Sequence, residues 1–188
     1  MKEETKKQFT HEIRRQIEWM NWLILALLKL SRLDANVEEF HQEKISLEKL
    51  IQNVIQNLAI PIEIKNQEII LQGDKNATII ADYKWQLEAI TNIVKNAIEH
   101  SPENKKIWIT LEEKTLFTKI LIKDEGPGIE KEDLRHIFER FYKGKQASEN
   151  SIGIGLALAK TIIEKQNGYI SCHSKRGEGT VFEIKYMK

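Results

Sequence analysis

The sequence predicts an α+β protein in which a two-layer α/β sandwich follows one long N-terminal helix. Three observations predict this class. Residues 1–33 contain no Gly or Pro and carry apolar residues at helical spacing. Two further helical segments, over 83–100 and 153–166, stand among short runs of alternating apolar residues. Tight turns join most of those runs, so we expect hairpin-connected strands with helices packed on them.

Length, composition and charge limit the classes of protein to which the chain can belong. At 188 residues, with 41% hydrophobic and 30% charged residues, it suits one globular domain with an appendage. A net charge of +1 gives no reason to expect a nucleic-acid partner. The single Cys172 excludes a disulfide framework, fits a reducing compartment and is expected to be a small core residue.

The N-terminal region is not expected to cross a membrane. Its most apolar run, Trp19 to Leu30, is shorter than the roughly 20 residues that a spanning helix needs, and we see no signal peptide. We therefore expect a cytoplasmic location, with any membrane attachment made by segments outside this chain.

Residues 1–33 are predicted to form one continuous helix that ends near Asn36. Two adjacent apolar stripes run along it; one contains Ile13, Ile17, Met20, Ile24 and Leu27, and the other Trp19, Leu23, Ala26, Leu30 and Leu33. Together they form a face too wide for a two-stranded seam, which favours a helical bundle between copies of the chain. We expect a homo-oligomer through this helix, and domains over residues 1–40 and 41–188.

The remaining elements follow from caps, turns and apolar periodicity. Ser46 and Asp82 are expected to cap helices, Pro61 to end the first of these, and Gly73-Asp74 to form a turn between two strands. Strands are expected over 44–46, 67–71, 77–81, 106–112, 115–123, 169–173 and 180–186. Helices are expected over 47–58, 83–100, 130–138 and 153–166, with a mobile polar loop over 143–151.

The helix over 83–100 carries a polar edge beside its apolar face. The apolar face contains Leu87, Ile90, Ile93, Val94, Ala97 and Ile98. Asn92, Asn96 and His100 recur at four-residue steps and so share the neighbouring edge. An amide oxygen is a neutral, hard ligand that suits Mg²⁺ completed by water and phosphate, so this edge is a candidate site for a metal-bound nucleotide. The alternative is an ordinary solvated helix edge.

Two segments could approach a ligand at the ends of strands. Asp124 follows an apolar strand and could accept a hydrogen bond from an exocyclic amine, while Gly126 and Gly128 allow the backbone to approach closely. An ordinary strand-to-helix turn is the alternative. The segment from Gly177 to Thr180 precedes the last strand, where a hairpin turn is the alternative.

Gly153 and Gly155 open the helix over 153–166 and make its start a candidate phosphate site. Backbone N–H groups are exposed at a helix start, and the helix dipole favours an anion there. A Rossmann interpretation fails because no strand directly precedes these glycines. The residues expected to face inward are Leu156, Ala159, Ile162 and Ile163.

The segment from Phe138 to Lys143 lies at the base of the polar loop. We expect its aromatic side chains to fill core positions. Arg140 and Lys143 could meet phosphate oxygens, and the alternative is that these charges are merely solvated.

Taken in order, these segments resemble the ATP-binding catalytic domain of sensor histidine kinases of two-component systems, in the GHKL or Bergerat-fold superfamily. The resemblance extends from about Lys44 to the C-terminus, and five boxes carry it: Asn92 to His100, Asp124 to Gly128, Phe138 to Tyr142, Gly153 to Ala157 and Gly177 to Thr180. It implies a Bergerat ATP-binding fold with ATP and Mg²⁺ as cofactors.

The resemblance also implies roles for individual residues. Asn96 is similar to the Mg²⁺ ligand, Asn92 to a residue that supports metal and phosphates, and Asp124 to the adenine-reading carboxylate. The other implied nucleotide contacts are His100, Gly126, Gly128, Arg140, Tyr142, Lys143, Gly153, Gly155, Leu156 and Thr180. Residues 143–152 would form a lid. The chain departs from the family at Glu99, where a basic residue is common, and at Ser151, where a glycine is common.

The N-terminal helix resembles a shortened dimerisation and phosphoacceptor region. The segment around His11 and Glu12 is similar to the phosphoacceptor box, and residues 22–35 are similar to the end of the second helix of that region. In the family a long helix and a turn separate these pieces, whereas here they are continuous, and Arg15-Gln16 replaces the expected Thr-Pro. We interpret this as an internal deletion, and the alternative for His11 is an ordinary surface residue.

The resemblance implies a protein-histidine kinase that transfers the γ-phosphoryl group of ATP to a histidine and then to the receiver domain of a response regulator. His11 would be the nucleophile, Glu12 would hold its other ring nitrogen or take its proton, and Asn92 would support the transfer. One alternative is an ATPase of the gyrase or MutL kind or a related serine kinase, but those place a glutamate base where this chain has Asn92. Another is a non-catalytic nucleotide-binding dimerisation module.

Overall fold

One uninterrupted helix forms the N-terminal unit of the protein. The computed structural model describes residues 3–144 and 152–188 and divides into two units, Met1–Glu38 and Glu39–Lys188. Helix α1 spans Glu3–Asp34, so the prediction of a continuous helix is confirmed. It ends two residues before Asn36, whose φ of 52° is a left-handed conformation that Asn tolerates. No helix within the described residues is long and apolar enough to cross a membrane.

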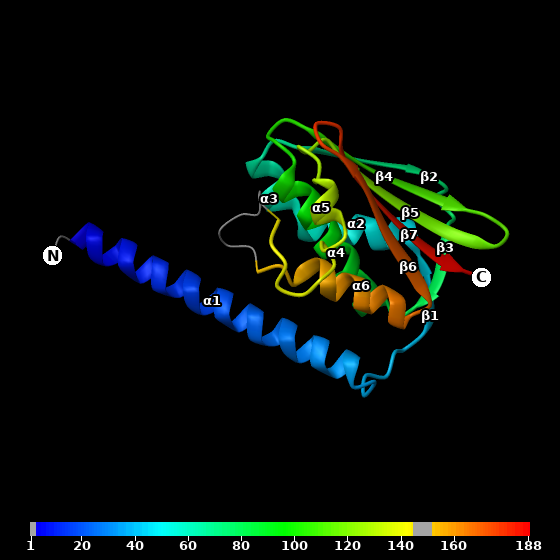
Figure 1. Cartoon of the computed structure of the whole chain (residues 1–188), viewed down its shortest axis with the longest axis horizontal. Helices are drawn as coiled ribbons and strands as arrows, with labels where there is room; N and C mark the ends of the chain where they lie inside the picture. The colour runs from blue at the N-terminus through cyan, green and yellow to red at the C-terminus, as the bar shows by residue number, and fades with distance from the viewer. Residues whose placement is uncertain (1–2, 145–151) are drawn as a thin grey trace. The chain divides into compact units, whose positions relative to one another are not determined.

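The second unit is built on a five-stranded sheet in the order β2–β4–β5–β7–β6 (Figure 1). Its strands are β2 (Glu68–Gly73), β4 (Lys106–Glu113), β5 (Phe117–Asp124), β6 (Gly168–Lys175) and β7 (Gly179–Met187). β4–β5 and β6–β7 are antiparallel pairs that follow one another in sequence, while β2 lies parallel to β4. The last strand, β7, lies between β5 and β6 and pairs Lys123 with Val181. This order brings the end of β5 to the start of β7.

Helices cover one face of this sheet and complete the two layers (Figure 1). They are α2 (Leu47–Asn57), α4 (Tyr83–His100) and α6 (Gly155–Lys165), with α4 packed between the other two. Alternate residues of the strands point into the core, including Ile107 and Ile109 of β4 and Phe182 and Ile184 of β7, all 0% exposed. Each such side chain contributes roughly 1.5–3 kcal/mol when it is fully buried. The predicted two-layer α/β sandwich is confirmed.

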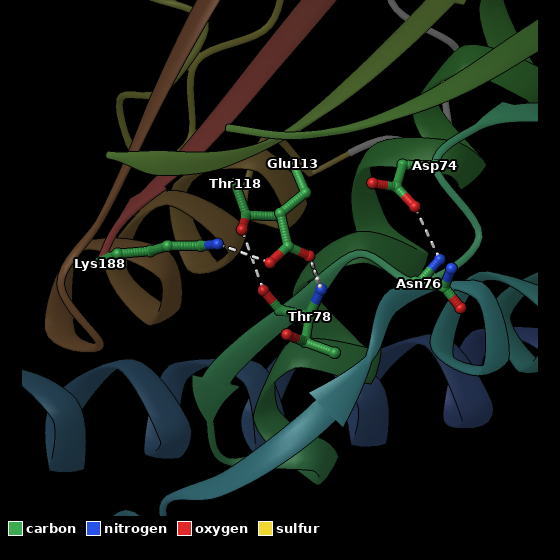
Figure 2. A network of polar contacts seen from close by, with 6 residues as sticks. All are labelled: Asp74, Asn76, Thr78, Glu113, Thr118 and Lys188. Atoms are coloured by element: carbon green, nitrogen blue, oxygen red, sulfur yellow. Dashed lines mark hydrogen bonds and ion pairs between the residues drawn. The ribbon is translucent and has the colours of Figure 1, made fainter. Parts of the chain in front are cut away.

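A small two-stranded sheet stands beside the large one. Strands β1 (Glu43–Ser46) and β3 (Thr78–Ala81) pair antiparallel. Figure 2 shows how β3 is joined to the large sheet: the Thr78 N–H donates to the Glu113 carboxylate at 2.8 Å, and the Thr118 hydroxyl donates to the Thr78 carbonyl at 3.0 Å. Lys188 also contacts Glu113, so the C-terminal residue closes the same network.

Two expectations about turns are wrong. Pro61 does not end α2; it lies inside a separate short helix, α3 (Ala59–Ile64), within the first turn, where its missing N–H has no helical partner to lose. The strands on either side of Gly73-Asp74 do not pair with each other, because β2 pairs with β4 and β3 pairs with β1. The chain turns at Asp74, whose side chain accepts the Asn76 N–H at 2.9 Å (Figure 2), and then enters the other sheet.

Two helices are shorter than expected. Only Lys131–Leu134 is helical as α5, and the chain continues in turns, with the Glu139 N–H bonded to the carbonyl of His136. These turns let the Phe138 ring pack on Phe182 at a centroid distance of 6.3 Å. Helix α6 begins at Gly155 instead of residue 153. Its Leu156 is half-buried, not inward as expected, whereas Ala157 and Leu158 are buried. Leu87 of α4 is also only half-buried.

Candidate functional site

Helix α4 positions the polar edge that the sequence singled out. Asp82 caps its N-terminus by accepting the N–H groups of Lys84 and Trp85 at 3.0 and 3.2 Å. The predicted inward face is buried, apart from Leu87, and the side chains of Asn92, Asn96 and His100 are half-buried beside it. These three side chains therefore remain accessible on a helix that the core holds in place.

The C-terminal end of α4 is capped by side chains from another segment. The Lys65 ammonium donates to the carbonyls of Ile98, Glu99 and Ser101 at 2.9, 2.7 and 2.9 Å. The last carbonyls of a helix have no partner within it, and a cation is favoured at this end of the helix dipole. Gln67 adds hydrogen bonds from its amide to the carbonyls of Ser101 and Pro102 at 3.0 and 2.9 Å.

His100, the last residue of α4, is expected to be neutral at pH 7. Burial lowers the pKa of its imidazole, and the nearby positive charge of Lys65 lowers it further, against an opposing effect from Glu99. A neutral imidazole offers one donor nitrogen and one acceptor nitrogen. His100 can therefore bind a ligand by hydrogen bonding without contributing a positive charge.

The strand-end cluster, consisting of Asp124, Gly126, Gly128, Gly179 and Thr180, forms where β5 ends and β7 begins. Asp124 is only 2% exposed. Its Oδ1 atom accepts the N–H of Gly126 at 2.8 Å and the N–H of Thr180 at 3.2 Å. Among the described residues no hydrogen bond is made to Oδ2, so one carboxylate oxygen is fixed and the other remains able to accept a ligand's donor.

Burial raises the pKa of Asp124 to about 6, although the hydrogen bonds from Gly126 and Thr180 act in the opposite direction. The carboxylate is therefore the main form at pH 7, and its ionisation changes within about one unit of that pH. Cys172, on β6, is half-buried instead of being a core residue; burial raises the pKa of its thiol to about 12, and the charge of Asp124 adds to this effect. The thiol is consequently protonated and not reactive.

The glycines of this cluster are required by close backbone contacts. A Cβ atom on Gly126 would lie 3.0 Å from the carbonyl oxygen of His100, which shows that the end of α4 touches the loop after β5. A Cβ on Gly128 would lie 2.2 Å from the carbonyl oxygen of Lys175, and one on Gly179 would lie 2.1 Å from that of Asp124. Both of these glycines have positive φ, 76° and 90°, so a side chain is excluded there by strain as well as by space.

The helix-edge cluster, consisting of Asn92, Asn96, His100, Gly153 and Gly155, brings α4 to the start of α6. A Cβ on Gly155 would lie 3.7 Å from Oδ1 of Asn92, so the first residue of α6 stands directly beside that amide. Gly153 has a φ of 73°, and a Cβ there would lie 2.1 Å from the carbonyl oxygen of Tyr142. Among the described residues no side chain caps the start of α6, so its first backbone N–H groups lie beside the amide of Asn92, a suitable place for phosphate oxygens.

Magnesium fits the donors that this edge offers. No group of three or more His, Cys, Asp or Glu side chains that could hold a metal occurs in the described part of the chain. Mg²⁺ does not need such a group, because it keeps several waters and binds through few protein oxygens together with phosphate. Within residues 9–144 and 152–188, the amides of Asn92 and Asn96 make no side-chain hydrogen bond, so their oxygens are available as ligands.

The segment between α5 and the gap in the described residues is held by Asp133 and Gly153. The Tyr142 hydroxyl donates to Asp133 at 2.6 Å, and this bond is the main reason that the pKa of Tyr142 is raised to about 12. The Phe141 N–H donates to the carbonyl of Gly153 at 2.9 Å. Phe141 has a φ of 64° and is 57% exposed, so the expectation that the aromatics of this segment fill the core is wrong for it.

The predicted charged contacts of this segment, Arg140 and Lys143, are exposed side chains, and Leu156 is half-buried at the start of α6. Ser151 and the larger part of the expected lid, residues 145–151, lie outside the described residues.

The predicted phosphoacceptor pair lies on α1, in the other unit. His11 and Glu12 are exposed. The Glu12 carboxylate accepts hydrogen bonds from Arg15 at 2.6 Å and Gln16 at 3.2 Å. The bond from Arg15 is the largest cause of a lowered pKa for Glu12, which makes this carboxylate a weaker base.

Sequence reasoning missed four residues that organise the site. Lys65 and Gln67 cap α4, Asp133 holds Tyr142, and Ser174 bonds to the segments on both sides of the strand-end cluster. None of them lies in a glycine-containing box. A usable signal existed only for Ser174, a polar residue at an inward position of a strand whose preceding inward positions are Ile170 and Cys172.

Comparison with known proteins agrees with this geometry. Residues 81–188 match the family of histidine kinase-, DNA gyrase B- and HSP90-like ATPases. The chain is 31% identical over 170 residues to the sensor histidine kinase YclK of Bacillus subtilis, an alignment that covers 85% of this chain and 36% of that protein. It is also 31% identical over 183 residues to the heme sensor protein HssS of Staphylococcus saprophyticus, covering 97% of this chain and 39% of that protein. The chain thus spans 36% and 39% of the length of these relatives.

Solved structures of histidine kinases share the fold. The nucleotide-free catalytic domain of histidine kinase ThkA matches with a TM-score of 0.70 at 28% identity, covering 80% of this chain and 97% of that one. A structure of ThkA in complex with the response regulator protein TrrA matches with a TM-score of 0.79 at 25% identity, covering 100% of this chain and 53% of that one. The chain therefore belongs to the histidine kinase-, DNA gyrase B- and HSP90-like ATPase family, and within it to the ATP-binding domains of two-component sensor histidine kinases.

Proposed function

We propose that residues 41–188 bind ATP with Mg²⁺, the adenine at the strand-end cluster and the phosphates at the helix-edge cluster. The observation that carries this proposal is the contact between the two clusters: His100 ends the helix that bears Asn92 and Asn96, and its carbonyl touches Gly126, whose N–H is bonded to Asp124. One nucleotide could therefore span from Asp124 to the start of α6.

The protein offers suitable binding groups for both the base and the phosphates of the nucleotide. Oδ2 of Asp124 would accept a hydrogen bond from the exocyclic amine of adenine, an interaction that guanine cannot provide at the same position. Asn96 would bind Mg²⁺ and Asn92 would support the metal and the phosphates, while the backbone N–H groups after Gly153 would bind phosphate oxygens. Arg140 and Lys143 are exposed cations that could neutralise phosphate charge. Tyr142 would act through its backbone, since its hydroxyl is bonded to Asp133.

Magnesium would supply charge neutralisation for transfer of the γ-phosphoryl group. Such transfer depends mainly on positioning and electrostatics. The residues of this chain would orient the phosphates and exclude water, and a histidine nitrogen would be the acceptor. We propose that this chain is the cytoplasmic kinase part of a sensor histidine kinase, whose membrane attachment is made by segments outside this chain. Its phosphoryl group would pass to a response regulator. The ThkA complex with a response regulator supports a partner of this kind.

Calorimetry on the fragment 41–188 tests the nucleotide site directly. Asn96→Ala should weaken Mg-ADP binding about tenfold while leaving metal-free ADP binding nearly unchanged, since only the metal loses a ligand. Asp124→Asn should reduce the preference for ADP over GDP. Asn57→Ala, at an exposed position at the end of α2, is the matched control. Unchanged nucleotide affinity in both Asn96→Ala and Asp124→Asn would remove the site assignment.

The N-terminal unit supports a second proposal, that α1 associates with copies of itself. Its first apolar stripe is exposed in the single chain: Ile13 by 45%, Ile17 by 61%, Met20 by 53% and Ile24 by 53%. A contiguous apolar surface of this kind favours burial between chains. Light scattering at several concentrations should show a dimer or tetramer that Ile17→Lys disrupts and Gln16→Lys does not. A monomer at all concentrations would contradict this proposal.

The continuous helix also favours the second candidate function, a nucleotide-binding oligomerisation module with little kinase activity of its own. His11 lies on an unbroken helix, and Glu12 is bonded to Arg15 and Gln16. We therefore expect little phosphorylation of His11, although ATP binding persists. Acid-labile phosphate measured with radiolabelled ATP, in the wild type and in His11→Gln, decides between the two functions, and strong labelling of His11 would favour the kinase.

A further inference from the structure

The loop after β5 is fastened to the hairpin between β6 and β7 at several points. Gly128 leaves no room for a side chain against the carbonyl of Lys175, and the Gly177 N–H donates to the carbonyl of Pro127 at 2.7 Å. An ion pair of 2.9 Å joins Arg176 to Glu130 at the surface. The position of Gly126 and Gly128 in the strand-end cluster therefore depends on the hairpin.

Ser174 lies at the centre of this attachment. Its hydroxyl oxygen is 2.8 Å from the N–H of Ile129, 2.8 Å from the carbonyl of Gly179 and 3.0 Å from the hydroxyl of Thr180. A serine hydroxyl has one donor and two acceptor sites. If its proton is donated to Gly179, it accepts from Ile129 and from the Thr180 hydroxyl, so all its hydrogen-bonding capacity is used.

These bonds connect Ser174 to Asp124 through a single residue. The Thr180 hydroxyl bonds to Ser174, and the Thr180 N–H donates to Oδ1 of Asp124. Gly179, whose carbonyl accepts from Ser174, is pressed against the carbonyl of Asp124. Ser174 thus fixes the position of the loop after β5 on one side of the Asp124 carboxylate and the position of the Thr180 N–H on the other side.

We propose that Ser174 is a positioning residue for base recognition, which holds the 126–129 loop and the Thr180 N–H in register around Asp124. This inference rests on the proposed nucleotide site. Ser174 acts through Ile129 and Thr180 and is not itself required to touch the nucleotide.

Removing the hydroxyl should affect binding in a way that a general loss of stability would not. Ser174→Ala leaves the Ile129 N–H, the Gly179 carbonyl and the Thr180 hydroxyl without their partner. Affinity for Mg-ADP should fall roughly tenfold, as expected for the loss of one or two hydrogen bonds. A weakened bond from Thr180 should also raise the pKa of Asp124 further, so the pH at which half of the ADP affinity is lost should move upward.

The experiment is calorimetric titration of Mg-ADP and Mg-GDP into each variant between about pH 5 and 8, a range that brackets the pKa of Asp124. Thermal melts first establish the temperatures at which each variant is folded. Ser174→Thr keeps the hydroxyl and should retain most of the affinity. Ser171→Ala makes the same change on the same strand, at a position that faces away from the strand-end cluster, and should behave as wild type. If Ser174→Ala does not fold, Ser174→Cys, with a weak donor in place of the hydroxyl, takes its place.

The outcomes are distinct. The positioning role is supported if Ser174→Ala binds Mg-ADP more weakly and loses half of its affinity at a higher pH (the pH midpoint), and if Ser174→Thr restores both values. Unchanged affinity, or weaker affinity with an unchanged midpoint, overturns it, as does an equal effect of Ser171→Ala. A wild-type protein that binds no nucleotide would refute the proposed function and this inference with it, whereas wild-type binding with an insensitive Ser174 refutes the inference alone.

Discussion

The strand-end cluster and the helix-edge cluster are held in different ways. Around Asp124, backbone N–H groups and tightly packed glycines fix each position, so the cluster is formed before any ligand arrives. Along α4, the amides of Asn92 and Asn96 make no side-chain hydrogen bond to any other described residue. If the nucleotide binds as proposed, the base meets a preformed cluster, whereas the side chains for the phosphates become fully bonded only with metal and ligand.

The largest effect is expected where backbone packing defines the rigid cluster. Gly179→Ala places a Cβ 2.1 Å from the Asp124 carbonyl oxygen at a φ of 90°, which should destabilise the protein by at least about 3 kcal/mol. Gly177→Ala is the control, because its φ is also positive but nothing lies within 4 Å of the added methyl group. Urea unfolding of both variants measures the difference, and equal losses would contradict the rigid-cluster account.

The ionisation of Asp124 should make nucleotide binding at the strand-end cluster weaker at low pH. Because its pKa is raised from 3.8 to about 6, adenine-nucleotide affinity should decrease as pH falls through 6, approaching a tenfold loss per pH unit. Asp124→Asn should remove this dependence. A wild-type affinity that stays constant between pH 5 and 7 would show that the carboxylate does not read the base.

In the absence of ligand, the raised pKa of Asp124 should also lower the free energy of unfolding as the pH rises. The unfolded chain releases this proton near 3.8 and the folded chain near 6, so between these values unfolding is increasingly favoured, by about 3 kcal/mol in total. Asp124→Asn should lack this decrease, and urea unfolding of both proteins at pH 4 and pH 7 measures it. A decrease of the same size in Asp124→Asn would assign the effect to other groups.

The stability of the C-terminal end of α4, where the two clusters meet, should depend on Lys65. Lys65→Met removes hydrogen bonds to the carbonyls of Ile98 and Glu99 in α4 and of Ser101 just after it, and should cost about 2 kcal/mol of stability. Lys106→Met is the matched control, since Lys106 makes an exposed ion pair of 3.0 Å with Glu68 that should contribute less than about 0.5 kcal/mol. If both variants unfold at the same urea concentration, Lys65 does not cap the helix in solution.

The smallest change is expected from Gly155→Ala on the helix-edge cluster. The nearest atom to the added methyl group would be Oδ1 of Asn92 at 3.7 Å, so the fold should tolerate it and gain roughly 0.5 kcal/mol from the better helix former. The methyl group would nevertheless occupy space beside Asn92, and ATP affinity should fall a few fold. Unchanged ATP affinity with raised stability would place the phosphates elsewhere.

The sequence predicts much of this fold because its signals are local. Caps at Ser46 and Asp82, the unbroken helix α1 and the alternation along β4 all depend on neighbouring residues, and the structure contains them. Strand pairing is not local, which explains why Gly73-Asp74 suggested two adjacent strands that in fact belong to different sheets. The same holds for Lys65 and Ser174, whose roles depend on residues that only the folded chain brings near them.

Amide chemical shifts measured by NMR during a titration with Mg-ADP test the central claim most directly, that one nucleotide spans both clusters. We predict that the amides of Gly126, Thr180 and Gly155 shift together with a single affinity, while those of β2 and α3 stay in place. Shifts confined to one cluster, different affinities for the two, or no shifts at either would contradict a single nucleotide bound from Asp124 to the start of α6.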